Sequence, residues 1–360
     1  MSKKIHIAVA GSTEYTTLLA GVLHQHQSFH IPWILTPQPR AIGRKQIVTP
    51  NPLHKFAQDN LIKTILVDKK IDVGIRQQIE LANQVKPADY LLVVDFGYLI
   101  PEWLISLPKK QPLNVHPSRL PEWRGTSPGQ YVLLSGSEYS AVTLMVMNQF
   151  FDQGPILTQL EFPTSGLDQK KYYDLSFDLV SQQLAQLIQQ YHSGQIVAKP
   201  QPQLSPTPNS GKINKDDSQL DWSIFIRNLA NNKAAKPLST KNQQLSTTIL
   251  NQELGRKSPV SCPLLTQVLA NTPRELEPVI IERACRAFAR WPGVWTKITN
   301  YPRENRAATD QAISPHLEKR LKILSCQLTE EEGNIKILPQ AVQLEGKNPC
   351  RWNDLRANLL

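Results

Sequence analysis

The sequence predicts an α/β protein, with a first domain built on a mostly parallel sheet and a smaller second domain of β-strands. Three observations support this fold class. Short apolar runs alternate with amphipathic segments in the first half of the chain. A segment rich in proline and small polar residues follows at 199–212. Beyond it, apolar runs succeed one another without helices between them, which favours a small barrel.

The elements of the first domain follow from its apolar pattern. Residues 5–11 predict a buried strand, and Ser12 is the candidate N-cap of the amphipathic helix after it. Residues 168–194 predict a long closing helix, because apolar residues recur at helical spacing and Gly194 suits its end. Further strands are expected at 31–36, 64–68, 89–97, 111–116, 140–148 and 155–162.

The domain boundary is expected at the proline-rich segment, because 360 residues exceed the usual length of one domain. We expect a first domain at 1–198, a stiff exposed linker at 199–212 and a second domain at 213–360. A polar stretch with little periodicity, at about 230–278, predicts a mobile insertion in the second domain. Strands of that domain are expected at 294–300, 320–328 and 334–346.

Positive charge is concentrated in the second half of the chain. The formal net charge is +10 at pH 7. Residues 1–198 carry 17 Lys and Arg against 15 Asp and Glu, whereas residues 199–360 carry 23 against 15. A basic domain indicates a polyanionic partner such as a nucleic acid. A soluble surface that is merely basic explains the charge equally well.

Composition and motifs argue against a membrane-bound, secreted or metal-dependent protein. No run of about 18 apolar residues is present. The first residues, MSKKIHIAVAG, lack the apolar core and cleavage site of a secretory signal, so we expect a cytoplasmic location. The four cysteines are widely spaced, without a CxxC or Cys/His pattern, which predicts no metal site and fits a reducing compartment.

An amide and an imidazole stand together near the end of one predicted strand. Asn114 and His116 are two residues apart in 111–116, so their side chains point to the same face. Pro117 then interrupts the strand. In open α/β sheets this carboxyl edge is where ligands bind. The alternative is that His116 is an ordinary, partly buried polar residue.

Asp152 is the third candidate, because it precedes Gly154 in a loop between two predicted strands. Its carboxylate could orient the imidazole and support the protonated form, while Asn114 and His116 donate hydrogen bonds to a developing oxyanion. Such a set needs no nucleophilic side chain, and it favours direct transfer of an acyl-like group between two bound substrates. Sequence separation alone does not establish that the three residues meet.

Several segments resemble the methionyl-tRNA formyltransferases, and the resemblance covers nearly the whole chain. They are AGSTEY, TPQPRAIGRKQIVTPNP, FGYLIPEWL, LNVHPSRLPEWRGTSPGQ, VTLMVMNQFFDQGPIL, INKDDSQLDWS and CRAFARWPGVW. The resemblance implies a Rossmann-like formyltransferase catalytic domain followed by an OB-like β-barrel domain that serves as a platform for tRNA.

The resemblance also implies a reaction. The formyl group of 10-formyltetrahydrofolate, a co-substrate, passes to the free amino group of methionyl-initiator tRNA during translation initiation. The catalytic trio matches Asn114, His116 and Asp152. The partners are then the initiator tRNA and the folate, and we expect a monomer that needs no metal.

The resemblance implies that Ser118, Arg119, Leu120 and Pro121 contribute to folate binding. Two residues depart from the family pattern. Arg119 stands where an apolar residue is usual, and it either meets the glutamate tail of the folate or points to solvent. Asp95 stands where a small residue is common, and it either disturbs the pterin pocket or serves there as a hydrogen-bond acceptor.

The stretch TPQPRAIGRKQIVTPNP resembles the loop with which the family grips the acceptor end of the initiator tRNA. Arg44 matches the arginine on which the family relies, and Arg40 and Lys45 add positive charge beside Gly43. The alternative is an ordinary basic surface loop. The insertion at about 230–278 either contacts tRNA or is a tolerated surface loop.

Three other functions share parts of this pattern. An amino-sugar-nucleotide formyltransferase would use the same trio, but it would require neither the arginine loop nor a basic second domain. A catalytically decayed tRNA-binding relative is opposed by the complete trio. A formyl-folate hydrolase, with water as acceptor, would give the tRNA-like loop no purpose.

Overall fold

The computed structural model describes residues 3–43, 45–230, 236–237, 263–298, 318–356 and 359. The chain divides into two compact units. The first unit comprises Met1–Arg124, Ser140–Phe162 and Tyr173–Pro206, and the second comprises Gly125–Tyr139, Pro163–Tyr172 and Thr207–Leu360. Two short segments from the first half of the chain therefore belong to the second unit. The sequence-based division into 1–198, 199–212 and 213–360 stays a prediction.

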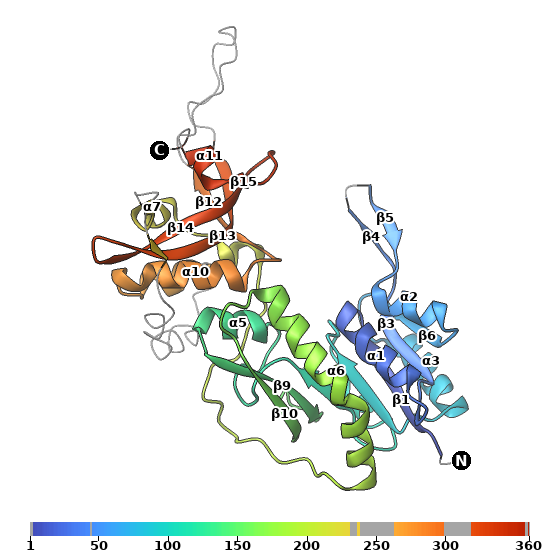
Figure 1. The fold of residues 1–360 in the computed structure, drawn as a ribbon. Helices are drawn as coiled ribbons and strands as arrows, with labels where there is room; N and C mark the ends of the chain where they lie inside the picture. The colour runs from blue at the N-terminus through green and yellow to red at the C-terminus, as the bar shows by residue number, and fades with distance from the viewer. Residues whose placement is uncertain are drawn as a thin grey trace. The chain divides into compact units, whose positions relative to one another are not determined.

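The first unit is built on an eight-stranded mixed sheet of order β10-β9-β8-β7-β1-β3-β6, with β2 paired to β1 (Figure 1). Strands β8, β7, β1, β3 and β6 run parallel, whereas β9 is antiparallel to β8. The predicted strands of this domain are confirmed. Their bounds are β1 (Ile5–Gly11), β2 (Phe29–His30), β3 (Trp33–Pro37), β6 (Lys63–Val67), β7 (Tyr90–Val94), β8 (Leu113–His116), β9 (Tyr139–Val146) and β10 (Ile156–Pro163).

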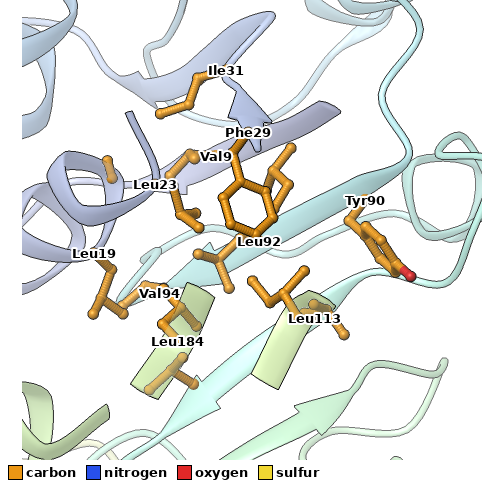
Figure 2. Packing of buried hydrophobic residues seen from close by; sticks show 14 of the residues in the cluster. Val9, Leu19, Leu23, Phe29, Ile31, Tyr90, Leu92, Val94, Leu113 and Leu184 are labelled. Carbon is orange, nitrogen blue, oxygen red and sulfur yellow. The ribbon is translucent and has the colours of Figure 1, made fainter. Parts of the chain in front are cut away.

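Two hydrophobic clusters form the core of this unit. Leu92 belongs to one cluster together with Leu19 and Leu184 from two helices (Figure 2), whereas its neighbour Leu91 belongs to the other cluster with Ile79. Successive residues of a strand point to opposite faces, so a strand buried on both faces is apolar throughout. The helices are α1 (Glu14–Gln25), α2 (Pro52–Asp59), α3 (Val73–Val85), α4 (Glu102–Ile105) and α6 (Gln169–Ser193).

The prediction that Ser12 caps helix α1 is wrong by one residue. Thr13 is the N-cap, and its side chain accepts a hydrogen bond from the backbone N–H of Thr16. The hydroxyl of Ser12 instead donates to the carbonyl of Asp95, 3.3 Å away. Ser12 directly follows β1, and its hydrogen bond to Asp95 keeps it at the strand end. Thr13 is therefore the first residue that can cap α1. The predicted end of α6 is confirmed, because Gly194 has φ +81°.

A separate hairpin follows strand β3. Strands β4 (Arg40–Ile42) and β5 (Ile47–Thr49) pair antiparallel with each other in a two-stranded sheet (Figure 1). Ile42, Ile47 and Val48 are all exposed on it. A two-stranded hairpin with exposed apolar residues gains little stability by itself, which fits a segment kept for contact with a ligand or partner.

The second unit contains an antiparallel sheet of order β11-β13-β14-β15, with β12 paired to β13. The strands predicted in this part of the chain are confirmed where the structure describes them. Their bounds are β11 (Lys236–Pro237), β12 (Val294–Ile298), β13 (Lys319–Glu331), β14 (Asn334–Leu344) and β15 (Cys350–Arg351).

Helix α10, which lies before the predicted strands of this domain, is an element that the apolar pattern did not predict. Helix α10 is buried along most of its length and contacts β13, β14 and α5. Buried charged residues, including Glu277 and Arg283, conceal its core-facing pattern in the sequence. The helices of this unit are α5 (Pro128–Ser135), α7 (Trp222–Arg227), α9 (Leu264–Ala270), α10 (Glu277–Ala287) and α11 (Trp352–Arg356), with 3₁₀ turns at Lys215–Ser218 and Arg274–Leu276. No helix in the described part of the chain has the length and hydropathy that a membrane span requires.

Two stretches expected to be exposed or mobile are partly folded. In the predicted linker, Lys199 exchanges backbone hydrogen bonds with Ile156, and Ser210 is buried. In the predicted insertion, Leu265 and Leu269 of α9 are buried, so its last part is folded. Residues 231–235 and 238–262 of that insertion lie outside the described residues.

Candidate active site

Strand β8 positions the first two candidate residues. Leu113 and Val115 point into the hydrophobic core, so Asn114 and His116 lie on the opposite face of the strand. Asn114 stands opposite Val93 of β7, and His116 is paired with Thr143 of β9. These two side chains are therefore held by a strand that has neighbours on both sides.

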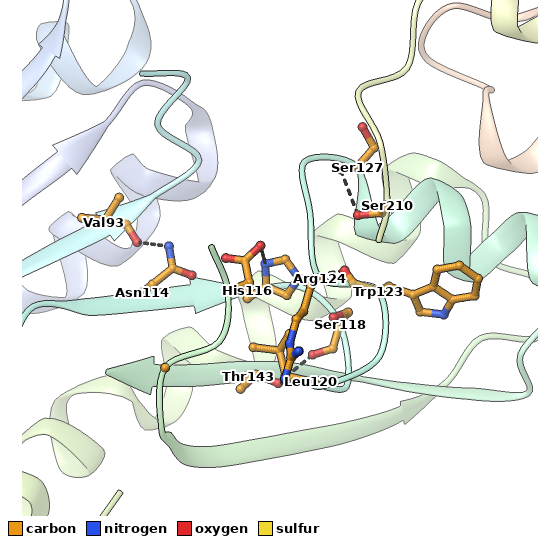
Figure 3. Close-up of polar contacts among 12 residues, drawn as sticks. Val93, Asn114, His116, Ser118, Leu120, Trp123, Arg124, Ser127, Thr143 and Ser210 are labelled. Carbon is orange, nitrogen blue, oxygen red and sulfur yellow. Dashed lines mark hydrogen bonds and ion pairs between the residues drawn. The ribbon is translucent and has the colours of Figure 1, made fainter. Parts of the chain in front are cut away.

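The imidazole of His116 lies between a backbone carbonyl and a carboxylate. Its Nε2 is 3.1 Å from the carbonyl oxygen of Trp123 (Figure 3), and its Nδ1 is 3.7 Å from Oδ2 of Asp152. The ring is buried, with 5% of its surface exposed. A carbonyl only accepts hydrogen bonds, so Nε2 carries a proton. A second proton, on Nδ1, would face the carboxylate, and the arrangement therefore suits an imidazolium.

The loop that carries Asp152 is held from two sides. Asp152 has a left-handed backbone, with φ +53°. The amide of Gln201 donates to the carbonyls of Asp152 (3.0 Å) and Gly154 (2.7 Å). Any side chain at Gly154 would collide with the carbonyl of Val146, so glycine allows the loop to lie close to β9. The carboxylate therefore faces the imidazole from a fixed loop.

The amide of Asn114 is only partly satisfied. Its Nδ2 donates to the carbonyl of Val93 at 3.3 Å (Figure 3). Its Oδ1 is buried and has no hydrogen-bond partner among the described residues. Buried polar atoms are nearly always paired, and an exception beside a His–Asp pair indicates a place where a ligand donates a hydrogen bond.

Residues 118–121 form a rigid segment beside the site. Ser118 is fully buried, and its hydroxyl donates to the carbonyl of Glu122 at 2.6 Å. The hydroxyl of Thr143 donates to the Ser118 carbonyl and also accepts from the N–H of Leu120 (Figure 3). Leu120 is buried and Pro121 is half-buried. The side chain and the backbone of Ser118 are thus both engaged within the protein, so this residue holds the shape of the segment.

Arg119 points away from the buried part of this segment. Its guanidinium lies 3.0 Å from the carboxylate of Glu161, and both side chains are about half exposed. This exposed position is compatible with both roles considered for the residue, contact with the glutamate tail of the folate and exposure to solvent.

Asp95 follows β7 with a left-handed backbone, φ +47°. Its side chain is exposed, but the surrounding protein still desolvates the carboxyl and raises its pKa. A hydrogen bond from the side chain of Thr13 lowers this pKa, and the charge of Glu14 raises it further. Asp95 therefore lies beside the start of α1, at the carboxyl edge of the sheet.

The basic residues of the hairpin lie apart from the trio. Arg40 donates to the hydroxyl of Tyr98 (2.6 Å) and to the carbonyl of Asp68 (3.1 Å). Lys45 is exposed in the turn, and Arg44 lies outside the described residues. Within the described part of the chain, neither Arg40 nor Lys45 contacts the His–Asp pair.

Sequence reasoning missed the support of the Asp152 loop. Arg124 is buried, and its guanidinium donates to Oε1 of Gln201 at 2.9 and 3.2 Å and to two neighbouring carbonyls. Burial lowers the pKa of Arg124, and the charge of Asp152 raises it. In the sequence, Arg124 appeared only as part of the motif LPEWRG, and no pattern in residues 199–212 distinguished Gln201.

Two phenylalanines beside Asp152 were also missed. Phe150 and Phe151 have 55% and 62% of their surface exposed. Adjacent exposed aromatic side chains offer faces on which planar groups can stack. The FF pair in NQFFDQG was the available signal.

The cysteines and acidic residues form no metal centre in the described part of the chain, where no group of three or more His, Cys, Asp or Glu is placed to hold an ion. Cys285, Cys326 and Cys350 are free thiols, and Cys285 is the buried one among them. Cys262 lies outside the described residues.

With this geometry in hand, comparison with known proteins defines the family. The sequence profile described as "Formyl transferase" matches residues 3–188. A methionyl-tRNA formyltransferase of Ehrlichia chaffeensis is 27% identical over 354 residues, which are 97% of this chain and 95% of that protein. One of Aromatoleum aromaticum is 30% identical over 228 residues, 63% of this chain and 70% of that protein.

The chain therefore belongs to the formyl transferase family, a class of enzymes. Within that family, its similarity to proteins named methionyl-tRNA formyltransferase extends over nearly its whole length, which confirms the resemblance noted in the sequence.

Solved structures confirm the α/β fold with a Rossmann-like first domain. A Helicobacter canadensis N-formyltransferase, solved with folinic acid and dTDP-3-aminofucose, has a TM-score of 0.51 at 16% identity and covers 91% of this chain and 89% of its own. A sugar 3N-formyl transferase, solved with dTDP and 5-N-formyl-THF, has a TM-score of 0.52 at 15% identity and covers 96% and 100%. At such low identity these matches concern the fold alone.

Proposed function

We propose that this enzyme transfers the formyl group of 10-formyltetrahydrofolate to the free amino group of methionyl-initiator tRNA, in the cytoplasm, at the start of translation. The observation that carries the proposal is the buried His116–Asp152 pair, next to Asn114 at the carboxyl end of a central strand, in a formyl transferase. Nearly full-length similarity to methionyl-tRNA formyltransferases supports the choice of acceptor.

In the proposed reaction the amino nitrogen attacks the formyl carbon, and the carbonyl electrons move onto the formyl oxygen. Asn114 donates one Nδ2 hydrogen to Val93, which leaves its second N–H for this oxyanion. The unpaired Oδ1 of Asn114 accepts an N–H of the attacking amine. One side chain thus orients both reacting groups.

His116 and Asp152 complete the charge and proton balance. An imidazolium at His116, held by the Trp123 carbonyl and the Asp152 carboxylate, stabilises the oxyanion by its positive charge. The tetrahedral intermediate collapses when the bond between the formyl carbon and the folate nitrogen breaks. The Asp152 carboxylate accepts the proton lost by the amine, and the departing nitrogen takes a proton from the His116–Asp152 pair.

The substrate sites follow from the surrounding segments. Leu120 and Pro121 form an apolar wall for the folate, and the buried Ser118 holds the loop that carries them. Arg119, at the surface beside Glu161, meets the glutamate tail of the folate. One chain carries both substrate sites, so the proposed reaction needs no second copy.

The proposed tRNA contacts are electrostatic and aromatic. The hairpin with Arg40, Arg44 and Lys45 grips the acceptor end, and the basic antiparallel sheet of the second unit, of OB-like type, supports the rest of the tRNA. Phe150 and Phe151 offer stacking faces to the terminal bases next to the site.

A direct acceptor test decides between this function and formylation of an amino-sugar nucleotide. The second function is considered because two sugar-formylating proteins share the fold over almost their whole length. Purified enzyme and 10-formyltetrahydrofolate are incubated with methionyl-initiator tRNA or with a dTDP-amino sugar. We expect formylation of the tRNA only. Formylation of the sugar alone would overturn the proposal.

A further inference from the structure

A cavity lies at the edge of the first unit's sheet opposite to the edge with Asn114 and His116. Its volume is about 480 Å³, within the usual range of small-molecule sites. Its walls come from the amino ends of β3 and β6 and from the carboxyl ends of α1, α2 and α3. These strands are parallel to β8, so the strand end with His116 lies at the other edge. The proposed reaction makes no use of this cavity.

The lining of the cavity is largely apolar. Ile31 and Ile62 contribute to it next to the strand starts, and Ile31 is buried. Leu61, Leu81 and Val85 line the same cavity but have 95%, 63% and 73% of their surfaces exposed. Exposed apolar groups gathered at one concavity are typical of a place where a ligand or partner covers them.

The left-handed backbone of Leu61 and the exposure of its apolar side chain are both energetically unfavourable. Leu61 follows the C-cap of α2 with φ +54°, a left-handed conformation in which glycine or asparagine is usual. Its N–H donates to the carbonyl of Gln58, and the N–H of Ile62 donates to Ala57, so the helix end imposes this backbone. Neither conformation nor burial explains a leucine here, whereas contact of its side chain with an apolar ligand does.

The charged side chains at the cavity are both cationic. Lys63 and Lys86 line it, are exposed, and have no ion-pair partner among the described residues. Burial lowers the pKa of the neighbouring His30, and Lys86, His6, Lys4 and His24 each lower it further. The potential at this edge is therefore positive. The carbonyls at the three helix ends carry partial negative charge, so an anionic group at this edge is held by the two lysines and not by the helix ends.

We propose that this cavity binds an amphiphile with an apolar body and a single carboxylate. The body lies against Ile31, Ile62 and Leu81, and the carboxylate lies at the mouth with Lys63 and Lys86. The apolar lining provides most of the affinity, and the two lysines select the sign of the head group.

Titration calorimetry with decanoate tests the proposal on the full-length enzyme. We expect one saturable site with a dissociation constant on the order of 100 µM, because only part of the alkyl chain of decanoate is buried. Acetate lacks the apolar body and decylammonium carries the opposite charge, so both should bind at least about tenfold more weakly.

Variants at the cavity locate the site. Leu81→Asp places a carboxylate in the lining and should weaken decanoate binding at least about tenfold. The double variant Lys63→Gln/Lys86→Gln should weaken it about fivefold and abolish the preference over decylammonium. Val197→Asp and Lys69→Gln change an exposed apolar residue and an exposed lysine that do not line the cavity, and they should bind as the parent does. Thermal unfolding shows that each variant is folded.

The titration of His30 gives a second readout. A bound carboxylate offsets the positive charges of Lys4, Lys86, His6 and His24, so decanoate should raise the pKa of His30 as followed by NMR of labelled histidine. Absence of saturable binding, equal binding of decylammonium, or unchanged binding in Leu81→Asp would each overturn the proposal.

Discussion

At the scale of single residues, Asn114 is the most direct test of the proposed chemistry. Its amide touches Val93 on one side and leaves a buried oxygen unpaired on the other. Loss of one oxyanion donor typically lowers kcat by about 10²–10³. We therefore expect Asn114→Ala to reduce single-turnover formyl transfer by about that factor while the variant keeps its fold. Transfer within tenfold of the parent enzyme would refute the role given to Asn114.

Gln201 tests whether the Asp152 loop must be held in place. Its amide donates to the carbonyls of Asp152 and Gly154 and accepts from Arg124. Gln201→Leu removes these bonds, and we expect kcat to fall by about tenfold, because misplacement by a fraction of an ångström weakens a positioned group. The KM for the folate should change little.

A matched control is available two residues further along the chain. Gln203 contributes only its backbone carbonyl to the described contacts of Arg124, so Gln203→Leu should leave kcat unchanged. Equal kcat values for the Gln201 and Gln203 variants would show that the hydrogen bonds of the Gln201 side chain have no part in catalysis.

At the scale of elements, a partly buried ion pair joins α7 to α10. Glu277 has 3% of its side chain exposed and accepts from Arg227 and Asn228. Burial alone would raise the pKa of Glu277, but hydrogen bonds from Arg227 and Asn228 outweigh it, so the pKa lies below its ordinary value of 4.5. The ionised carboxylate therefore stabilises the fold at neutral pH, and this contribution is lost as pH falls through the folded-state pKa.

Glu277→Gln should lower the free energy of unfolding at pH 7 by about 2 kcal/mol, because a charge-assisted pair is replaced by a neutral one. Urea unfolding at pH 7 and below pH 4 measures this, and the difference from the parent enzyme should shrink at the lower pH. The exposed pair of Lys297 and Glu318 is the control, and Glu318→Gln should cost less than about 0.5 kcal/mol. A difference at Glu277 that is independent of pH would contradict the assigned cause.

At the scale of the whole molecule, the +10 charge determines how a polyanionic substrate associates. Binding of methionyl-initiator tRNA should weaken steeply between 50 and 200 mM salt, by about 10³-fold if roughly six phosphates are contacted. Arg44→Ala should lower the salt slope by about one and leave folate affinity unchanged. Lys63→Ala, at the opposite edge of the sheet, is the control. Binding that is insensitive to salt would argue against tRNA as substrate.

From the sequence alone came the α/β fold class, the positions of most strands along the chain and the choice of Asn114, His116 and Asp152 as candidates. Apolar periodicity is local, and two residues on one strand share a face whatever the rest of the molecule does. Resemblance to the formyltransferases then provided the chemistry. The apolar pattern placed the helix cap at Ser12 and did not predict α10, because a cap depends on where the strand releases the chain and because the buried charges of α10 are paired only in three dimensions.

The surroundings of the candidate residues depend on the three-dimensional packing of the chain. The contact between His116 and Asp152 joins residues 36 positions apart, and Gln201 reaches the same loop from a segment expected to be a linker. The surface position of Arg119 depends on its contact with Glu161. The cavity lined by Lys63 and Lys86 is assembled from the ends of three helices and two strands. Each of these arrangements depends on packing between distant segments, and a pattern that repeats every two or 3.6 residues contains no information about such packing.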